Sequence, residues 1–340
     1  GLVAIALAFI LALMGRVNLN IVFAGFPTKL FLTILGTMYF FCMLQENKTL
    51  ELASRKIISC FSAQPFWIPV VIYLVSYVMS AAGPGAISVQ AVMVLFAMSL
   101  ATQVHISADL LAAMAVFGSA GGTASPIALA GIIVTDLSAN MGVPNLPLRV
   151  FYGVSLVHLA AGIIFYFALG GYKIKIDQQL QIKNLPAFNR DQKLSLAACL
   201  LLVILVVGLR YDIGLTCFVL ALGLILLKAV HEKQAFAMLP WNVLLLICGV
   251  NVLMNVIKEI GGIKLFAAAL ATLMNGTTAS ALMAATAGFM AWFSSAHGVV
   301  LPALIPTVPD IVAQVGPGAD TVELISAIVA AANIGGLGPM

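Results

Sequence analysis

The chain has 340 residues, of which 62% are hydrophobic and 8% charged. Soluble domains contain roughly 45–50% apolar and about 25% charged residues, so this composition excludes a soluble enzyme. It also excludes a disordered chain, which would be poor in apolar residues. The 16 basic and 12 acidic residues give a net charge of +4, without the basic stripe that a nucleic-acid partner requires. The composition predicts an integral membrane protein whose partner is the lipid bilayer.

Apolar runs follow one another along the chain, and each full crossing of a membrane needs about 20 residues. In chain order the runs are 2–14, 30–44, 66–101, 108–135, 149–169, 194–209, 213–227, 241–257, 278–315 and 322–332. The chain starts inside the first run without a Met and stops in a glycine-rich stretch, so we expect a fragment of a longer membrane protein. The five cysteines show no metal-ligand spacing, and we expect buried, reduced thiols.

Three of these runs are interrupted. Runs 66–101 and 278–315 are too long for one crossing and are broken by small residues, which predicts two re-entrant helical hairpins. Run 108–135 contains the stretch Gly118–Pro126, whose three glycines and one proline do not favour a regular helix. The sequence therefore predicts an all-α, polytopic membrane protein with two re-entrant hairpins and discontinuous helices.

The distribution of Lys and Arg predicts the orientation. Segments 45–65, 170–193 and 228–240 hold most of the basic residues and share one side of the membrane if the hairpins are re-entrant. By the positive-inside rule this side is cytoplasmic. We expect a location in a bacterial cytoplasmic membrane, with loop 170–193 in the cytoplasm.

The second half of the sequence repeats the first. Pro27 and Gly36 match Pro240 and Gly249 at an offset of 213, and Ser80 matches Ser294 at 214. With the predicted orientation the two copies are inverted, which is typical of secondary transporters with a site near the midplane. The predicted organisation is a first repeat over 1–169 (hairpin 66–101, broken helix 108–135), a linker over 170–193, and a second repeat over 194–340 (hairpin 278–315, broken helix 322–340).

The predicted site lies where these helices break. We expect four breaks to meet, two at the hairpin tips and two near Gly121 and Gly335, because unwound main chain at membrane depth must line a cavity or be buried in protein. Free N–H groups at the broken helices favour an anion. The candidate substrate- and ion-binding residues are Ser80, Ala81, Ala82, Gly83, Gly121, Gly122, Thr123, Ala124, Ser125, Pro126, Ser294, Ser295, Ala296, His297, Asn333, Gly335 and Gly336.

Close packing of helices is the alternative explanation for each glycine-rich stretch. The single polar residues also have structural alternatives. His158 is expected to bond a neighbouring helix rather than to relay a proton, and Asn251 and Asn255 either line the cavity or bond another helix. His297 is a candidate ligand or proton carrier.

Several of these residues carry a family resemblance. The stretch Ala24–Pro27, the tip Ser80–Gly85 and the stretch Gly121–Ile127 resemble the N-terminal region of MatC-type dicarboxylate (malonate/malate) carriers, which belong to the ion transporter superfamily. Ser294–Pro302 and Asn333–Gly336 resemble the matching elements of that superfamily.

The resemblance implies an elevator transporter, often a homodimer, that carries small dicarboxylates of the malonate, malate and succinate class. Related divalent anion/sodium symporters have a Ser-Asn-Thr signature at each tip. Ser80 and Ser294 match its serine, but alanine or serine replaces the other two residues. The resemblance implies Na⁺ at Ser80, Gly122 and Ser294, and no other cofactor. Because the signature is altered, H⁺ is the alternative coupling ion, with His297 as its candidate carrier.

Two other classes of function remain as alternatives. One is another transporter of the superfamily, either a cation/proton antiporter or an inorganic anion carrier, although an antiporter would require an acid near the breaks. The other is an intramembrane hydrolase. His231-Glu232 lacks the second histidine of a zinc site, and no Gly-x-Ser-x-Gly elbow occurs in the sequence.

Overall fold

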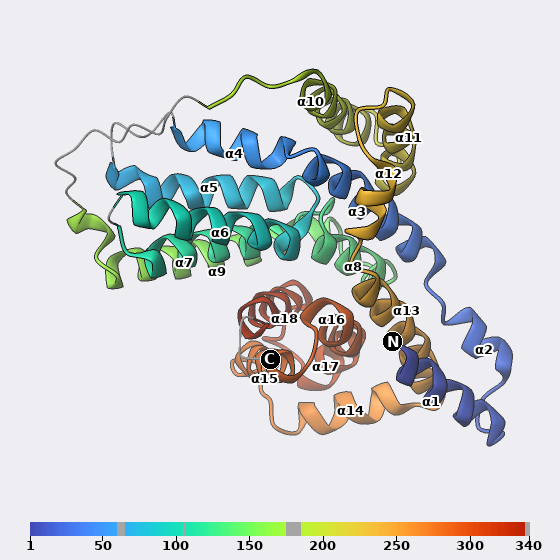
Figure 1. Ribbon diagram of the computed structural model, residues 1–340. Coiled ribbons are helices and arrows are strands. Elements are labelled where there is room, and N and C mark those ends of the chain that lie inside the picture. Colours follow the sequence, from blue (N-terminus) through green and yellow to red (C-terminus); the bar gives the residue numbers. More distant parts are fainter. Residues whose placement is uncertain (60–64, 105, 175–184, 337–340) are drawn as a thin grey trace. The chain divides into compact units, whose positions relative to one another are not determined.

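The computed structural model describes residues 1–59, 65–104, 106–174 and 185–336, and these residues form helices and turns without a strand (Figure 1). The helices of the first half are α1 (Leu2–Leu13), α2 (Leu19–Ala24), α3 (Thr28–Glu46), α4 (Thr49–Ser59), α5 (Ile68–Ala81), α6 (Gly85–Val104), α7 (Ala108–Gly122), α8 (Leu129–Leu137) and α9 (Leu146–Ala168), with short 3-10 turns at Pro65–Trp67 and Gly171–Lys173.

The second half follows with α10 (Arg190–Val203), η3 (Ile204–Gly208), α11 (Ile213–Leu226), α12 (Glu232–Ala237), α13 (Trp241–Glu259), α14 (Gly262–Ala271) and α15 (Ala279–Phe293). One continuous helical run then contains η4 (Ala296–Val300), α16 (Leu301–Leu304), η5 (Ile305–Thr307) and α17 (Val308–Val315). The last described helix is α18 (Thr321–Gly335). The all-α prediction is confirmed.

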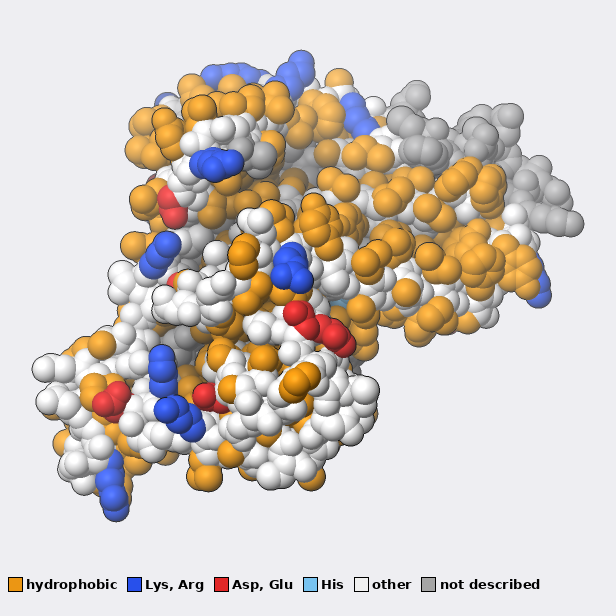
Figure 2. All heavy atoms as spheres, turned by 180° about the vertical axis from the view of Figure 1, so that it is seen from behind, with side chains coloured by type: hydrophobic (Ala, Val, Ile, Leu, Met, Phe, Trp, Pro, Cys, Tyr) orange, Lys and Arg blue, Asp and Glu red, His pale blue; other side chains and the backbone are white. Residues whose placement is uncertain are grey.

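Five helical stretches of the described chain are long and apolar enough to cross a membrane. They are Leu19–Glu46, Gly85–Thr102, Leu146–Ala168, Trp241–Glu259 and Ala296–Val315. Apolar side chains cover much of the face shown in Figure 2, and on α9 exposed residues include Leu156, Ile164 and Phe167. Many large apolar side chains are exposed, as expected of a surface that faces lipid. Together with the five candidate spans, they confirm the prediction of a polytopic membrane protein.

Helix boundaries recur along the chain at the spacing of the sequence repeat. Helices α3 and α13 begin and end 213 residues apart, and so do α7 and α18. The start of α7 is capped by Ser107, whose side chain accepts from the Leu110 N–H, and Asp320 caps α18 in the same way. Helices α4 and α14 occupy equivalent places before the two hairpins. The inverted orientation of the two copies stays a prediction.

The chain divides into two compact units that differ from the repeats. The first unit contains residues 1–31, 130–154 and 240–340, and the second contains 32–129 and 155–239. Each repeat contributes helices to both units, so the repeat boundaries at 169 and 194 remain predictions. The predicted linker, 170–193, lies in large part outside the described residues.

In the second unit, α5 and α6 form the first hairpin and both pack against α7 (Figure 1). The contact is close because α7 carries glycines one turn apart at the interface. A Cβ on Gly118 would overlap the carbonyl oxygen of Tyr73, and a Cβ on Gly122 would overlap that of Tyr77. These two glycines therefore allow helix packing.

The first unit contains the equivalent packing, in which α15 lies against α18. A Cβ on Gly335 would lie 2.5 Å from the carbonyl oxygen of Gly288 and 3.0 Å from the Cβ of Ala291. Gly335 is 213 residues after Gly122, and Ala331 is 213 residues after Gly118. Both repeats thus pack a helix with two small residues one turn apart against the first limb of their hairpin.

The structure changes the position of the first break. Helix α7 continues through Gly118 and Gly121 to Gly122, and the unwound stretch is 123–128, before α8. The prediction of a discontinuous helix is confirmed, but a break within Gly118–Gly122 is wrong because these glycines serve packing. For the second broken helix, 337–340 lie outside the described residues. The re-entrant course of both hairpins stays a prediction.

We expect Gly118→Val to lower the thermal stability of the purified protein in detergent, because the new side chain must displace the main chain of α5. Overpacking of this kind costs about 1–3 kcal/mol. Gly223→Val in α11 is the matched control, since nothing lies within 4 Å of a Cβ built there. Equal unfolding temperatures for the two variants would contradict the close α5–α7 contact.

Candidate functional site

The tip of the first hairpin is built from a tight turn that requires glycine. Helix α5 ends at Ala81, and the Ala82 N–H donates to the Val78 carbonyl at 2.9 Å. Gly83 and Gly85 have φ of 147° and 73°, in the region that disfavours side chains. A Cβ on Gly83 would also overlap the ring of Phe41 in α3. Two independent constraints therefore select glycine at the predicted tip.

This tip contacts the break that follows α7. The Ala86 N–H, in the first turn of α6, donates to Oγ1 of Thr123 at 3.2 Å. Thr123 is fully buried and is the first residue after α7. Turns continue through the break, where the Ser125 N–H donates to the Gly122 carbonyl at 3.0 Å. These bonds satisfy part of the unwound main chain of the tip and of the break, as burial requires.

Ser80 has a hydroxyl without a partner at this place. Its side chain is fully buried, and its Oγ has no hydrogen-bond partner among the described residues. By contrast, the hydroxyl of Ser119 donates to the Val116 carbonyl at 2.9 Å. A Cβ on Gly122 would lie 3.0 Å from the Cβ of Ser80. Because buried polar groups are normally paired, the hydroxyl of Ser80 is available to a ligand.

The second hairpin turns at Ser294 and Ser295 in the first unit. Ser294 adopts an extended conformation after α15, and its Oγ donates to the Met290 carbonyl at 2.7 Å. The Oγ of Ser295 accepts from the Gly298 N–H at 3.1 Å and caps the helical run Ala296–Val315. This helix begins with a π turn. Its start provides the free N–H groups that favour an anion.

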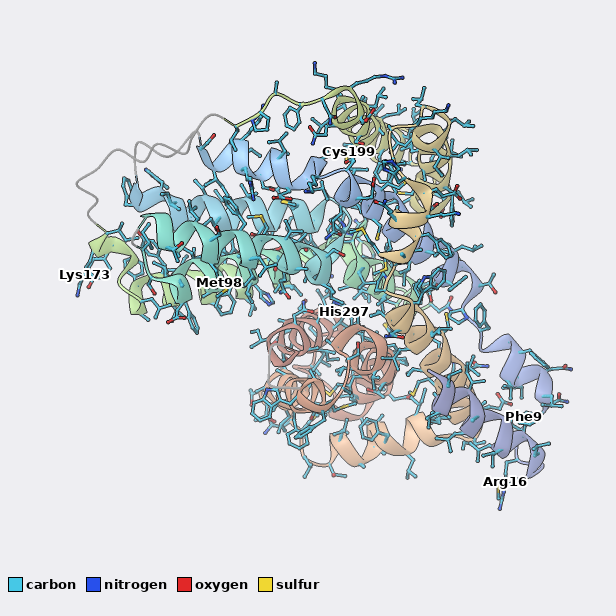
Figure 3. The ribbon with its side chains drawn as sticks, viewed as in Figure 1. Phe9, Arg16, Met98, Lys173, Cys199 and His297 are labelled. Carbon is cyan, nitrogen blue, oxygen red and sulfur yellow. The ribbon has the colours of Figure 1, made fainter. Side chains whose placement is uncertain are left out.

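His297 lies in the first turn of that helix and is labelled in Figure 3. Its side chain is 6% exposed, and Nε2 has no hydrogen-bond partner among the described residues. The end of α18 approaches the same turn, since a Cβ on Gly336 would lie 3.6 Å from that of Ala296. Asn333, one turn earlier on α18, is buried. The second tip therefore also has an unpartnered polar side chain at a helix start.

Each unit thus contains a half-site built from a hairpin tip and the end of the helix packed against it. We call these the first half-site (Ser80, Ala81, Ala82, Gly83, Gly122 and Thr123) and the second half-site (Ser294, Ser295, Ala296, His297, Gly335 and Gly336). Gly121, Ala124, Ser125 and Pro126 lie in the last turn of α7 and in the break beside the first half-site. The meeting of all four breaks at one place stays a prediction.

The equivalence of the two broken helices shifts by one residue. By the helix bounds, Gly335 occupies the structural position of Gly122, and Gly336 that of Thr123, whereas an offset of 214 would match Gly335 with Gly121. Helices α7 and α18 share an offset of 213, one less than the 214 that matches Ser80 with Ser294. The Thr123 hydroxyl that holds the first tip therefore has glycine as its counterpart.

The two asparagines among the other polar candidates have structural roles. The Asn255 side chain donates to the Ile21 carbonyl in α2, and Asn251 to the Ile247 carbonyl of its own helix, both at 2.9 Å. His158 is buried in α9 beside Gly121. Among the described residues, no group of histidines, cysteines and acids could hold a metal. Four cysteines are free thiols, and Cys60 lies outside the described residues.

One further residue, Ser76, lies near the first half-site and is not among the residues that the sequence predicts there. Ser76 lies one turn before Ser80 on α5, is fully buried, and its Oγ also has no partner in the described chain. The four-residue spacing was the signal that could have found it, because residues four apart share a helix face. The sequence does not show that this face of α5 packs against α7, nor that α7 offers no hydrogen-bond partner to the Ser76 hydroxyl.

We expect Thr123→Val to accelerate hydrogen exchange at the start of α6, because the Ala86 N–H loses its acceptor. Leaving a buried donor unpaired costs about 1–3 kcal/mol. Thr123→Ser keeps a hydroxyl and should retain the protection of the wild type. Hydrogen–deuterium exchange of the two variants in detergent tests this contact, and equal protection in both would contradict it.

Comparison with known proteins supports the resemblance seen in the sequence. Residues 1–123 match the family described as dicarboxylate carrier protein MatC N-terminus. The matched part includes the first hairpin and ends at Thr123, in the first half-site. No curated protein matches the chain. Over its first 123 residues, the chain is therefore similar to the MatC-type dicarboxylate carriers.

Proposed function

We propose that the protein is a secondary active transporter of small dicarboxylates of the malonate, malate and succinate class. The observation that carries this proposal is the presence of an unpartnered, buried polar side chain at both hairpin tips, Ser80 and His297. The family match over residues 1–123 supports the substrate class. It also favours a carrier over an enzyme.

The substrate is held without a permanent positive side chain. Neither tip contains Lys or Arg: the first reads Ser80-Ala81-Ala82-Gly83-Pro84-Gly85, and the second Ser294-Ser295-Ala296-His297. The helix starts at Gly85 and Ala296 offer N–H groups, each worth about 0.3–1 kcal/mol to an anion when exposed and more when desolvated.

Transport is proposed to follow an elevator mechanism in the bacterial cytoplasmic membrane, with a homodimeric scaffold, as the family resemblance implies. Paired hairpins at a repeated spacing support this mechanism, since inverted repeats with broken helices are typical of secondary transporters. The coupling ion is Na⁺ or H⁺. In the first half-site Na⁺ would use Ser80 and main-chain oxygens near Gly122, and in the second it would use Ser294. Alanine or serine replaces the asparagine and threonine of the symporter signature.

The second candidate within the superfamily is a cation/proton antiporter. Such a protein requires an ionisable acid in its membrane site. The described tips and the break 123–128 contain no Asp or Glu. Asp109 lies in the first turn of α7 and Asp310 in the first turn of α17, away from both tips in the sequence. The residues therefore favour an anion as substrate.

We expect the full-length protein in proteoliposomes to take up labelled malonate, malate or succinate under a Na⁺ or H⁺ gradient. Ser80→Phe should reduce uptake to background, because its side chain would fill the first half-site. Gly122→Val should do the same, because its side chain would push the end of α7 away from Tyr77 and Ser80. Gly223→Val is the control for insertion and folding, which are checked by size-exclusion profiles. Absence of dicarboxylate uptake by the wild type would refute the substrate class, and wild-type uptake by both variants would remove the first half-site from transport.

A further inference from the structure

The two hairpin tips differ in one titratable side chain. The first tip, Ser80 to Gly85, contains serine, alanine, glycine and proline only. The second tip has His297 two residues after the helix-capping Ser295. Histidine is the side chain that changes its charge between about pH 5 and 8 in water. Any proton exchange at the tips therefore involves the second repeat alone.

The surroundings of His297 favour its neutral form when no ligand is bound. The side chain is nine-tenths buried within a stretch able to span a membrane, and Nε2 has no partner among the described residues. A buried ion without a counter-ion is costly. The start of the helix adds a partial positive charge beside the ring, which opposes protonation further.

The elements packed against this turn provide no counter-ion nearby. They are α13, α15, α16 and α18. Helices α15 and α16 have no charged side chain, and α13 has the thiol of Cys248 in its middle and its charges only at Lys258 and Glu259.

Helix α13 touches the turn at Leu246, beside Gly298. Lys258 is 12 residues further on, or about 18 Å along the helix. On α18 the only acid is Glu323, in its first turn, whereas Gly336 beyond its last residue approaches Ala296. Asp310 lies 13 residues after His297 along the helical run Ala296–Val315, which is about 20 Å.

We propose that His297 is the proton-coupling residue, which takes up one proton when a substrate carboxylate binds at the second tip. This inference rests on the proposed dicarboxylate transport and assigns its coupling ion. The carboxylate supplies the negative charge that the empty site lacks. A proton from the solvent adds to the unprotonated ring nitrogen, and the imidazolium pairs with the carboxylate. On release, the N–H bond breaks and the proton leaves with the substrate on the opposite side.

The test uses the full-length protein in Na⁺-free proteoliposomes that contain a pH-sensitive dye. For the wild type we expect labelled succinate to acidify the interior as it enters, and an inward proton gradient to stimulate uptake. The apparent affinity should rise by up to about tenfold for each unit of decrease in pH. His297→Gln keeps a hydrogen-bonding side chain that cannot titrate, so its uptake should lose the acidification and the gradient response. Protonation of succinate itself affects both proteins equally.

His231→Gln is the matched control. His231 is exposed and its Nδ1 lies 2.9 Å from Oε1 of Glu46, away from either half-site in the sequence. This variant should behave as the wild type. If His297→Gln does not transport, its equilibrium binding of succinate is measured between about pH 5 and 8. If the His297→Gln protein fails to fold, the His297→Asn variant is used in its place.

The outcomes separate the two proposals. Uptake or binding by the His297 variants with the proton dependence of the wild type would overturn the role of His297 and leave dicarboxylate transport in place. Wild-type uptake that requires Na⁺ and does not move protons would do the same. No dicarboxylate uptake by the wild type under either gradient would overturn the transport proposal, and the coupling role with it.

Discussion

Unwound main chain inside a membrane protein must find its hydrogen-bond partners within the protein, and the rest of this structure depends on that constraint. At the first tip the partner is a side chain, since Oγ1 of Thr123 accepts from the Ala86 N–H. At the second tip the partner is Ser295, whose Oγ accepts from the Gly298 N–H. Beside these bonded groups, the side chains of Ser80 and His297 have no partner among the described residues, so a ligand can use them.

The constraint also explains the glycines around each half-site. A tip can be bound by the next helix only if that helix comes close, and Gly118, Gly122 and Gly335 allow this approach. Small residues at such contacts are typical of membrane helices, where packing rather than the hydrophobic effect drives association. The same few residues therefore bring the helices together and place the end of each helix beside its tip.

Much of the fold could be predicted from the sequence, because apolar length, interruption by small residues and a repeated spacing are properties of the chain itself. The hairpin tips at Ser80–Gly85 and Ser294–His297 lie where the runs indicated. The first break was placed a few residues early, since composition does not distinguish a glycine that ends a helix from one that allows a close contact. Whether Ser76, Ser80 and His297 have hydrogen-bond partners depends on the helices packed around them. No local sequence pattern therefore predicts that these side chains are unpartnered.

The second limb of the second hairpin begins with a π turn, whereas that of the first hairpin begins as an α-helix. In Ala296–Val300 the Val300 N–H donates to the Ser295 carbonyl, five residues back, whereas α6 starts as an α-helix. A π turn contains one residue more than an α turn and is frequent at functional sites. Removal of that residue would leave a regular helix and rotate the imidazole by about 100° relative to the limb that follows. Deletion of one residue in the second repeat would therefore change the direction of the His297 side chain. The first tip has less freedom to change, because Gly83 packs closely against Phe41.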